Sequence, residues 1–318
     1  MKLHWLGLTS MAVLAVTAAQ AQNRPAGPDS ATRRSLALAY LRVELANRDR
    51  PIAADRLGSL NQAFDRTTLA FFGGKYPAVI GSLDSVAAAI EVDTAVAQAH
   101  RTEAARILDH PAGQLRTVTM TDGTTFPYRL YVPAKARKHA AIVVAFHGAG
   151  TDERAFMGAY GAGKLRLLAD KRGFVLVTPF TNGVMVSADR FDRVIDDAAN
   201  AARFDRTRLF VLGHSLGSMT AWRFAQERGS VIRAVVCLAG AGAVTATRDK
   251  AAGLPRTLVI GAELDLLVPP ARLHPAVDAA KAVGWNVEYR ELANQGHTLM
   301  VGAALDQAMD WFFTSTKR

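Results

Sequence analysis

The sequence predicts an α/β fold in which a mostly parallel sheet of eight strands carries helices on both faces and follows a small all-helical domain. Three observations predict this fold. Apolar residues recur at three- and four-residue spacing over residues 31–110, which is the period of amphipathic helices. After residue 113 the pattern changes to short apolar or alternating runs, which are typical of strands. From the third run onward these strands alternate with helical segments, as in parallel α/β sheets.

Length and composition indicate a folded globular chain. Its 318 residues are 50% hydrophobic and 21% charged, so the chain can bury a large core and is neither disordered, collagen-like nor a coiled coil. The formal net charge of +10 would attract nucleic acid, anionic membrane surfaces or acidic substrates. The one cysteine, Cys237, excludes an internal disulfide and a cysteine-based zinc cluster.

Residues 1–21 have the pattern of a secretory signal peptide. Lys2 precedes a largely apolar stretch at 5–16, and Ala19-Gln20-Ala21 places small residues where a signal peptidase cuts. A membrane anchor is the alternative, but the apolar stretch is shorter than the roughly 20 residues that span a bilayer. We therefore expect a mature chain that begins near Gln22, has no transmembrane segment and is exported to the periplasm or the extracellular space.

The mature chain divides into two predicted parts. Residues 22–112 comprise a polar linker followed by the helical N-terminal domain, and residues 113–318 form the α/β domain. Proline and paired glycines interrupt the helical pattern, which indicates several helices. The helical pattern ends at Asp-His-Pro-Ala-Gly, residues 109–113, because a proline disfavours the helical conformation of the residue before it.

The elements of the second part follow in order. The predicted strands are residues 115–121, 126–132, 140–146, 173–178, 208–213, 233–239, 256–260 and 286–292. The predicted helices among them are residues 153–171, 189–203, 216–227, 270–283 and 300–313. An Asp-Gly turn at 122–123 joins the first two strands, so we expect these two to form an antiparallel hairpin.

A serine motif follows the fifth predicted strand. Gly-His-Ser-Leu-Gly at 213–217 stands between this apolar strand and a helical segment, which is the context in which G-x-S-x-G forms a nucleophile elbow. Glycines allow the backbone to approach closely at such a turn. The start of the helix places free N–H groups beside the serine oxygen. Ser215 is therefore the predicted nucleophile.

A second motif supplies the predicted oxyanion hole. His-Gly-Ala-Gly at 147–150 follows the third strand, where one backbone N–H donor is expected, and the other comes from the residue after the nucleophile. We assign these donors to Ala149 and Leu216, with Gly148 as the alternative to Ala149. A phosphate-binding loop is excluded because neither glycine-rich phosphate signature fits the segment.

A serine nucleophile needs a base that is oriented by an acid. Asp265 lies in the loop after the seventh strand, and Glu263 in the same loop is the alternative acid. His297 follows the eighth strand and is the predicted base. Because all these segments follow the carboxyl ends of predicted parallel strands, we expect them to meet at one edge of the sheet.

The remaining signals exclude other chemistries. No spacing of histidines and carboxylates indicates a metal site, and we predict no cofactor. His214 and Gly148 are expected to line the site, and His147 is expected to buttress the oxyanion loop or to line the site with them. Cys237 is expected to be a small core residue. Residues after 112 carry 26 Lys and Arg against 18 Asp and Glu, an excess of +8. The arginine-rich helices lack interleaved aromatic residues, so this excess indicates a solvated basic surface and no nucleic-acid partner.

From about residue 115 to residue 313 these motifs resemble the α/β-hydrolase superfamily. The His-Gly-x-Gly, Gly-His-Ser-Leu-Gly and Asp-x-x-Val-Pro sequences look like those of secreted bacterial esterases of the polyhydroxybutyrate-depolymerase and feruloyl-esterase type. They are also similar to prolyl-oligopeptidase-like hydrolase domains and dienelactone hydrolases. The resemblance implies Ser215 as nucleophile, His297 as base and Asp265 as orienting acid. The chain departs from these families in its missing cysteine pair and in its helical N-terminal region.

The predicted function is hydrolysis of carboxylic esters by a Ser-His-Asp triad through an acyl-enzyme, with a small or oligomeric ester as the partner. A prolyl-oligopeptidase-like peptidase and a non-catalytic envelope-binding protein are the alternatives. The segment between the sixth and seventh strands is short, so the α/β part has no large lid of its own. We therefore expect residues 31–110 to pack near the mouth of the site and shape its pocket.

Overall fold

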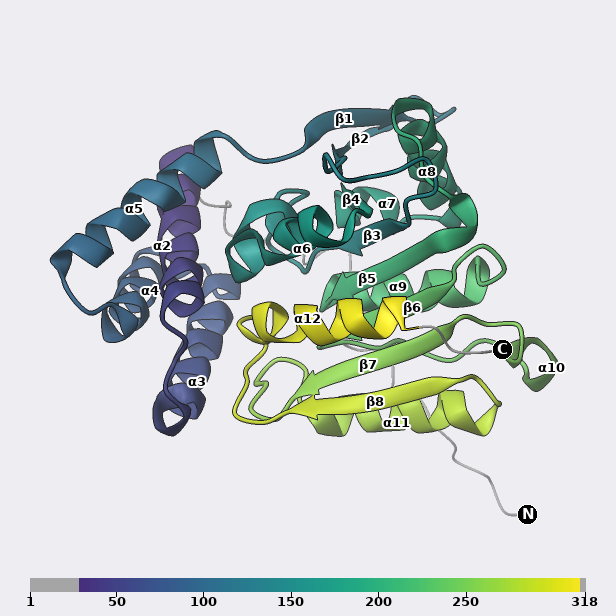
Figure 1. The fold of residues 1–318 in the computed structure, drawn as a ribbon. Coiled ribbons are helices and arrows are strands. Elements are labelled where there is room, and N and C mark those ends of the chain that lie inside the picture. Colours follow the sequence, from purple (N-terminus) through teal and green to yellow (C-terminus); the bar gives the residue numbers. More distant parts are fainter. Residues whose placement is uncertain (1–28, 315–318) are drawn as a thin grey trace, which may run out of the picture.

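The computed structural model describes residues 29–314 and has an eight-stranded sheet at its centre (Figure 1). The strands are β1 (Gln114–Thr119), β2 (Thr125–Tyr131), β3 (Ile142–Phe146), β4 (Val175–Pro179), β5 (Leu209–His214), β6 (Ala234–Leu238), β7 (Arg256–Ala262) and β8 (Val287–Leu292). All eight predicted strands are present. The predicted signal segment, residues 1–21, lies outside the described residues and stays a prediction.

The order of strands in the sheet is β1-β2-β4-β3-β5-β6-β7-β8. Strands β1 and β2 form the predicted antiparallel hairpin, and β2 pairs antiparallel with β4. Every later pairing is parallel. Strands β3 to β7 are almost wholly buried, as their continuous apolar sequences require. The predicted α/β fold with a mostly parallel sheet is therefore confirmed.

Helices cover both faces of the sheet. On one face pack α8 (Ala188–Ala201), α9 (Leu216–Glu227) and α11 (Pro270–Ala282). On the other face pack α6 (Lys164–Arg172) and α12 (Met300–Phe313). Cys237 is fully buried in the first of these two cores, as predicted. Two short helices, α7 (Thr181–Val184) and α10 (Arg248–Ala251), and the 3-10 turn η3 (Arg206–Arg208) complete this part.

One predicted helix, residues 153–171, is wrong in its first half. The segment contains a π-helical turn η1 (Ala155–Ala159) and a 3-10 turn η2 (Tyr160–Gly163) before α6 begins. Gly161, Ala162 and Gly163 all have positive φ angles of 56°, 50° and 81°. A right-handed helix cannot pass through left-handed residues, so the chain turns here and carries Tyr160 into the core of the molecule.

Between residue 29 and the sheet lie four helices: α2 (Ser30–Asp49), α3 (Ala54–Phe72), α4 (Tyr76–Ile90) and α5 (Thr94–Asp109). The side chains of Asp29 and Asp93 cap α2 and α5 by accepting from backbone N–H groups at 2.7 and 2.9 Å. Helices α2, α3 and α4 share an apolar core that also includes Leu299 of the α/β part. Figure 1 shows these helices beyond the carboxyl ends of the parallel strands.

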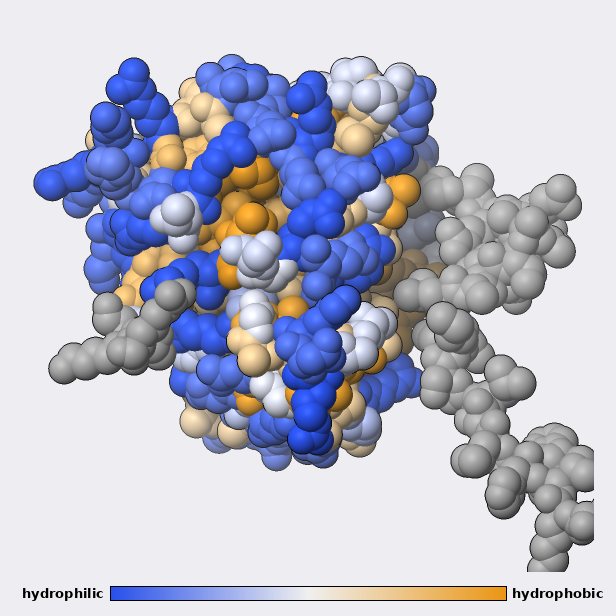
Figure 2. Space-filling view, turned by 90° about the vertical axis from the view of Figure 1, so that its right-hand side faces the viewer, coloured by the Kyte–Doolittle hydropathy of each residue, from blue (hydrophilic) through white to orange (hydrophobic). Residues whose placement is uncertain are grey.

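The face of the molecule farthest from these helices is mostly hydrophilic, with a small apolar area near its middle (Figure 2). Within residues 29–314, no helix is long and apolar enough to cross a membrane.

A buried carboxylate lies where α2 meets the turn at η2. Glu44 is 1% exposed, and the Tyr40 hydroxyl donates to its Oε1 at 2.7 Å. Burial raises the pKa of Glu44 to about 8, although the Tyr40 hydroxyl and the Gly161 N–H favour the charged form. The folded protein thus holds a proton that Glu44 of the unfolded chain releases near pH 4.5.

Glu44→Gln is expected to make the stability less dependent on pH. Because the pKa is raised in the folded state, the contribution of the protonated group is fully present below the unfolded pKa and is lost as the pH rises toward about 8. Glutamine stays neutral at every pH. Between pH 5 and 8 the unfolding free energy of the Glu44→Gln protein should therefore rise relative to that of wild type by about 1 kcal/mol per pH unit. Urea unfolding at three pH values measures this, with exposed Glu227→Gln as control. Parallel curves for Glu44→Gln and wild type would contradict it.

Candidate active site

Ser215 occupies a sharp turn between β5 and α9. Its backbone angles are φ 52° and ψ −116°, a conformation that is costly for a residue with a side chain. The flanking glycines make the turn possible. A Cβ at Gly213 would lie 2.2 Å from the carbonyl oxygen of Gly217, and a Cβ at Gly217 would lie 2.0 Å from that of Phe146. The Gly-x-Ser-x-Gly spacing is therefore a steric requirement of this turn.

Hydrogen bonds from β6 hold the strained turn in place. The N–H of Ser215 donates to the carbonyl of Leu238 at 2.9 Å. The hydroxyl of buried Ser218 lies 2.8 Å from the carbonyl of Gly213 and 2.7 Å from that of Leu238. Ser218 is not predicted as a functional residue from the sequence. The one feature that could have indicated its role is its position, since it is a small hydroxyl residue in the first turn of a helix whose other face is apolar.

The structure brings Asp265 and His297 together. Oδ2 of Asp265 lies 2.8 Å from Nδ1 of His297, and both residues are 3% exposed. The other carboxylate oxygen of Asp265 accepts from the N–H groups of Leu267 and Val268 at 2.8 and 2.7 Å. The alternative acid, Glu263, is exposed and accepts from the N–H of Asn294 instead. The geometry thus pairs His297 with Asp265.

The electrostatics of this pair fix the form of the imidazole. Burial raises the pKa of Asp265. The hydrogen bond and charge of His297 and the N–H groups of Val268 and Leu267 lower it by more, so the pKa lies below its usual value. An ionised carboxylate only accepts hydrogen bonds, so Nδ1 of His297 carries the proton. In the neutral tautomer that this contact selects, Nε2 is the nitrogen that can accept a proton.

Two backbone N–H groups are free at the site. Among residues 29–314, the N–H groups of Ala149 and Leu216 have no hydrogen-bond partner. Gly148, the alternative to Ala149, already donates its N–H to the Tyr160 hydroxyl at 3.2 Å. Leu216 is also the first residue of α9, where the positive end of the helix dipole lies. Both N–H groups are therefore free to donate, and their role in an oxyanion hole stays a prediction.

Tyr160 and His214 connect the loop of residues 147–150, which carries the predicted oxyanion donor, to the segment that carries His297. His214 Nε2 lies 2.9 Å from the carbonyl oxygen of His297, so this nitrogen carries the hydrogen. Its Nδ1 then accepts from the Tyr160 hydroxyl at 2.9 Å. Burial lowers the pKa of His214 to about 3 and raises that of Tyr160 to about 12, so both are neutral and the tautomer is fixed. The sequence predicts His214 at the site, whereas no local motif marks Tyr160.

The side chain of His147 packs behind the backbone of its own loop, residues 147–150. Its Nε2 accepts from the N–H of Thr181 at 2.9 Å, and its Nδ1 donates to the carbonyl of Gly148 at 2.8 Å. Burial lowers its pKa, so the ring is neutral. His147 is absent from the wall of the cavity, whereas Gly148, Ala149 and His214 are part of it. The ring of His147 is therefore turned toward α7 and braces the backbone of residues 147–150.

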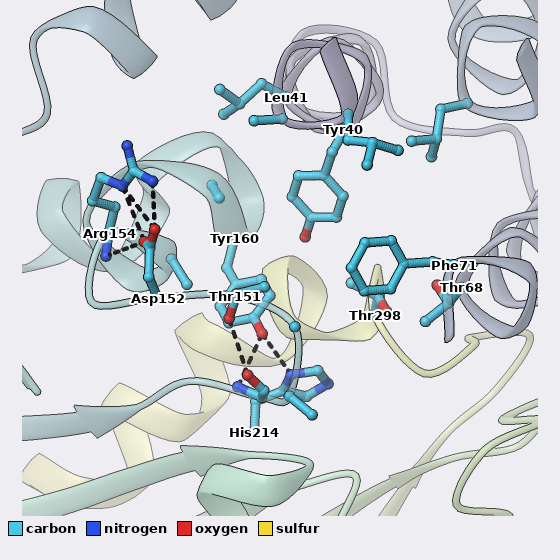
Figure 3. A pocket seen from close by; sticks show the side chains of 18 of the residues that line it. Tyr40, Leu41, Thr68, Phe71, Thr151, Asp152, Arg154, Tyr160, His214 and Thr298 are labelled. Carbon is cyan, nitrogen blue, oxygen red and sulfur yellow. Dashed lines mark hydrogen bonds and ion pairs between the residues drawn. The ribbon is translucent and has the colours of Figure 1, made fainter. Parts of the chain in front are cut away.

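A cavity of about 390 Å³ opens over Ser215 and His297. Its far wall comes from the N-terminal helices, as predicted for residues 31–110. Figure 3 shows Tyr40 and Leu41 of α2 and Phe71 of α3 facing Tyr160 and His214 across the cavity. Further apolar lining residues from these helices are Leu36, Phe64, Phe72, Val79, Leu83, Ile107 and Leu108. The cavity is therefore mainly apolar away from the serine.

The charged groups of the cavity wall are few. Among residues 29–314, Asp152 is the one carboxylate in it, and Arg154 binds both of its oxygens. Arg33 and Arg154 are the two cationic side chains. Within residues 29–314, no cluster of histidine, cysteine and carboxylate side chains could hold a metal ion.

The strand order, the serine turn after β5, the acid after β7 and the histidine after β8 together define an α/β hydrolase. The family model Hydrolase_4, described as serine aminopeptidase, S33, matches residues 137–295, which is half of the chain. The chain belongs to this family. No curated protein sequence matches it.

Solved structures share the fold at low sequence identity. A feruloyl esterase module from Clostridium thermocellum complexed with sinapinate has a TM-score of 0.54 and 17% identity, over 66% of this chain and 91% of that one. A fluorophosphonate-binding serine hydrolase from Staphylococcus aureus has a TM-score of 0.54 and 14% identity, over 64% and 99%. A thermostable esterase has a TM-score of 0.52 and 19% identity, over 63% of this chain and 62% of that one, so the chain spans less than two thirds of it.

Proposed function

We propose that the protein hydrolyses carboxylic esters through an acyl-enzyme formed on Ser215. The observation that carries the proposal is the buried Asp265–His297 pair, whose His297 lines the same mainly apolar cavity as Ser215. A serine hydroxyl is a weak nucleophile at neutral pH and needs such a base beside it.

The reaction follows from the roles of these groups. Oγ of Ser215 forms a bond to the ester carbonyl carbon while Nε2 of His297 takes the hydroxyl proton, and Asp265 stabilises the imidazolium. The N–H groups of Ala149 and Leu216 bind the resulting oxyanion. His297 then gives its proton to the departing alcohol, and the C–O bond to the alcohol breaks. Water attacks the acyl-enzyme by the same route and releases the acid.

The charge of the cavity favours an ester over the substrate of an aminopeptidase. The family description names an aminopeptidase, which makes peptide hydrolysis the second candidate. An aminopeptidase must bind a free α-ammonium group near the scissile bond, and a carboxylate is the usual partner for such a group. Asp152, the one carboxylate that the described part of the chain places in the cavity wall, is already paired with Arg154. The apolar remainder of the wall fits an uncharged group.

A panel of p-nitrophenyl esters tests the proposal. The apolar wall predicts that kcat/KM rises with acyl length, by up to about fourfold per methylene, until the chain outgrows the cavity. An aminoacyl p-nitroanilide with a free amino group should be a much poorer substrate than the matching ester. Esters of an acid with a terminal ammonium group serve as the charged control.

Covalent labelling separates the remaining alternatives. A fluorophosphonate probe should attach to Ser215, as peptide mass mapping would show. Aminoacyl anilides turned over faster than every ester would instead favour the aminopeptidase. Labelling that fails, with no hydrolysis of any ester or anilide, would favour a non-catalytic binding protein and end the proposal.

A further inference from the structure

Helix α3 contributes a buried carboxylate to the two loops that carry the acid and the base. Asp65 is fully buried. Its Oδ1 and Oδ2 lie 2.8 and 2.9 Å from the backbone nitrogen of His297, and Oδ2 also accepts from the N–H of Leu266 at 3.1 Å. Leu266 directly follows Asp265. One carboxylate thus joins the backbones of both loops.

A second side chain of α3 extends this contact. Asn61, one turn before Asp65, is 1% exposed and accepts from the N–H of Gly296 through Oδ1 at 2.9 Å. Its amide nitrogen donates to the carbonyl of Leu57 at 3.0 Å, which fixes the orientation of the side chain. A Cβ at Gly296 would lie 2.8 Å from Oδ1 of Asp65. The glycine before His297 therefore lets the helix approach this loop.

The surroundings of Asp65 are unusual for a buried acid. Within residues 29–314, every hydrogen bond to its carboxylate comes from a backbone N–H of the two loops, and no basic side chain pairs with it. Burial raises the pKa of Asp65, while the N–H groups of His297 and Leu266 oppose the rise. A buried acid costs stability unless its hydrogen bonds are made. The hydrogen bonds of Asp65 therefore hold α3 against both loops.

We propose that Asp65 and Asn61 are positioning residues of the active site, which hold the loops of Asp265 and His297 at a fixed separation. This inference rests on the proposed ester hydrolysis. Beyond the ends of β7 and β8 the N–H of Leu264 still donates to the carbonyl of Gln295 at 2.9 Å, and the bonds to Asp65 and Asn61 hold the parts of the loops that follow. A catalytic base displaced by about 1 Å loses roughly 100-fold in rate. The N-terminal helices are therefore part of the catalytic apparatus as well as the wall of the cavity.

Two substitutions of Asp65 test the proposal. Asp65→Ala removes both acceptors and should lower kcat for a short p-nitrophenyl ester by about 100-fold. Asp65→Asn keeps one acceptor oxygen but turns an amide group toward an N–H donor, so an intermediate loss of about tenfold is expected. KM should stay near its wild-type value because Asp65 is not part of the cavity wall. Asp55→Asn, an exposed aspartate in the first turn of the same helix, is the matched control.

Active-site titration distinguishes positioning from a purely structural role. A fluorophosphonate probe at long incubation counts the folded sites, and its labelling rate reports the reactivity of Ser215. In the Asp65 variants the final labelled fraction should match wild type while the labelling rate falls together with kcat. A kcat per labelled site equal to that of wild type would overturn the proposal.

Asn61→Ala provides the second variant where Asp65 variants do not fold. It removes only the acceptor for Gly296 and should lower kcat per labelled site by about tenfold. Unchanged kcat per labelled site in this variant would overturn the role of Asn61 and, where no Asp65 variant folds, the proposal as a whole. Failure of the wild-type protein to hydrolyse any ester would instead reject the proposed function.

Discussion

Ser215→Ala is expected to lower the turnover of a p-nitrophenyl ester by about 10⁶-fold, which is the scale seen when a triad serine is removed from other hydrolases. Without Oγ no acyl-enzyme forms, and only the binding site and the oxyanion donors remain to assist attack by water. The substitution removes one oxygen atom from a turn that is held by backbone bonds and by Ser218. Circular dichroism should therefore show a folded protein.

Ser230→Ala serves as the control for Ser215→Ala, because Ser230 is exposed in the turn after α9 and its loss should leave turnover unchanged. Steady-state assays at enzyme concentrations high enough to detect residual activity measure both variants. Turnover by Ser215→Ala within tenfold of wild type would reject Ser215 as the nucleophile.

Asp265→Asn is expected to lower kcat by about 10⁴-fold, the effect that the same change has in serine proteases. The asparagine amide can donate to Nδ1 of His297, which would stabilise the tautomer with the hydrogen on Nε2. That tautomer cannot accept the proton of Ser215. The substitution preserves the shape of the side chain, so the loss should appear in kcat with the fold retained.

Glu263→Gln is the matched control for the acid, because Glu263 lies in the same loop, is exposed and binds only the N–H of Asn294. Its kcat should remain close to that of wild type. A large loss in Glu263→Gln together with a small one in Asp265→Asn would reverse the assignment of the orienting acid.

Much of the fold follows from local sequence. The strands from β3 to β7 are apolar because both faces are covered, so their run lengths identify them. The turn at Ser215 is only partly local: a Cβ at Gly213 would clash with Gly217 within the same five residues, whereas a Cβ at Gly217 would clash with Phe146 of β3. Asp265 and His297 could be proposed because parallel strands place their following loops at one edge.

Other features could not be predicted because they depend on contacts between distant segments. The helix expected at 153–171 has regular apolar spacing, yet Gly161 and Gly163 turn the chain so that Tyr160 reaches His214. The orientation of His147 depends on the N–H of Thr181, a residue 34 positions away. Nothing in the local pattern distinguishes a ring that lines a cavity from one that braces the loop behind it.

The sequence by itself determined the α/β sheet, the serine turn and the order of the acid and the base, because each rests on short-range spacing and on the burial of parallel strands. Only the tertiary structure decided which acid meets His297 and what the N-terminal helices do. Asp65 and His297 are 232 positions apart, and Asn61 and Gly296 are 235 apart. Such contacts form when a helix packs across the ends of two strands, and they follow from the packing of whole elements, which no local periodicity records.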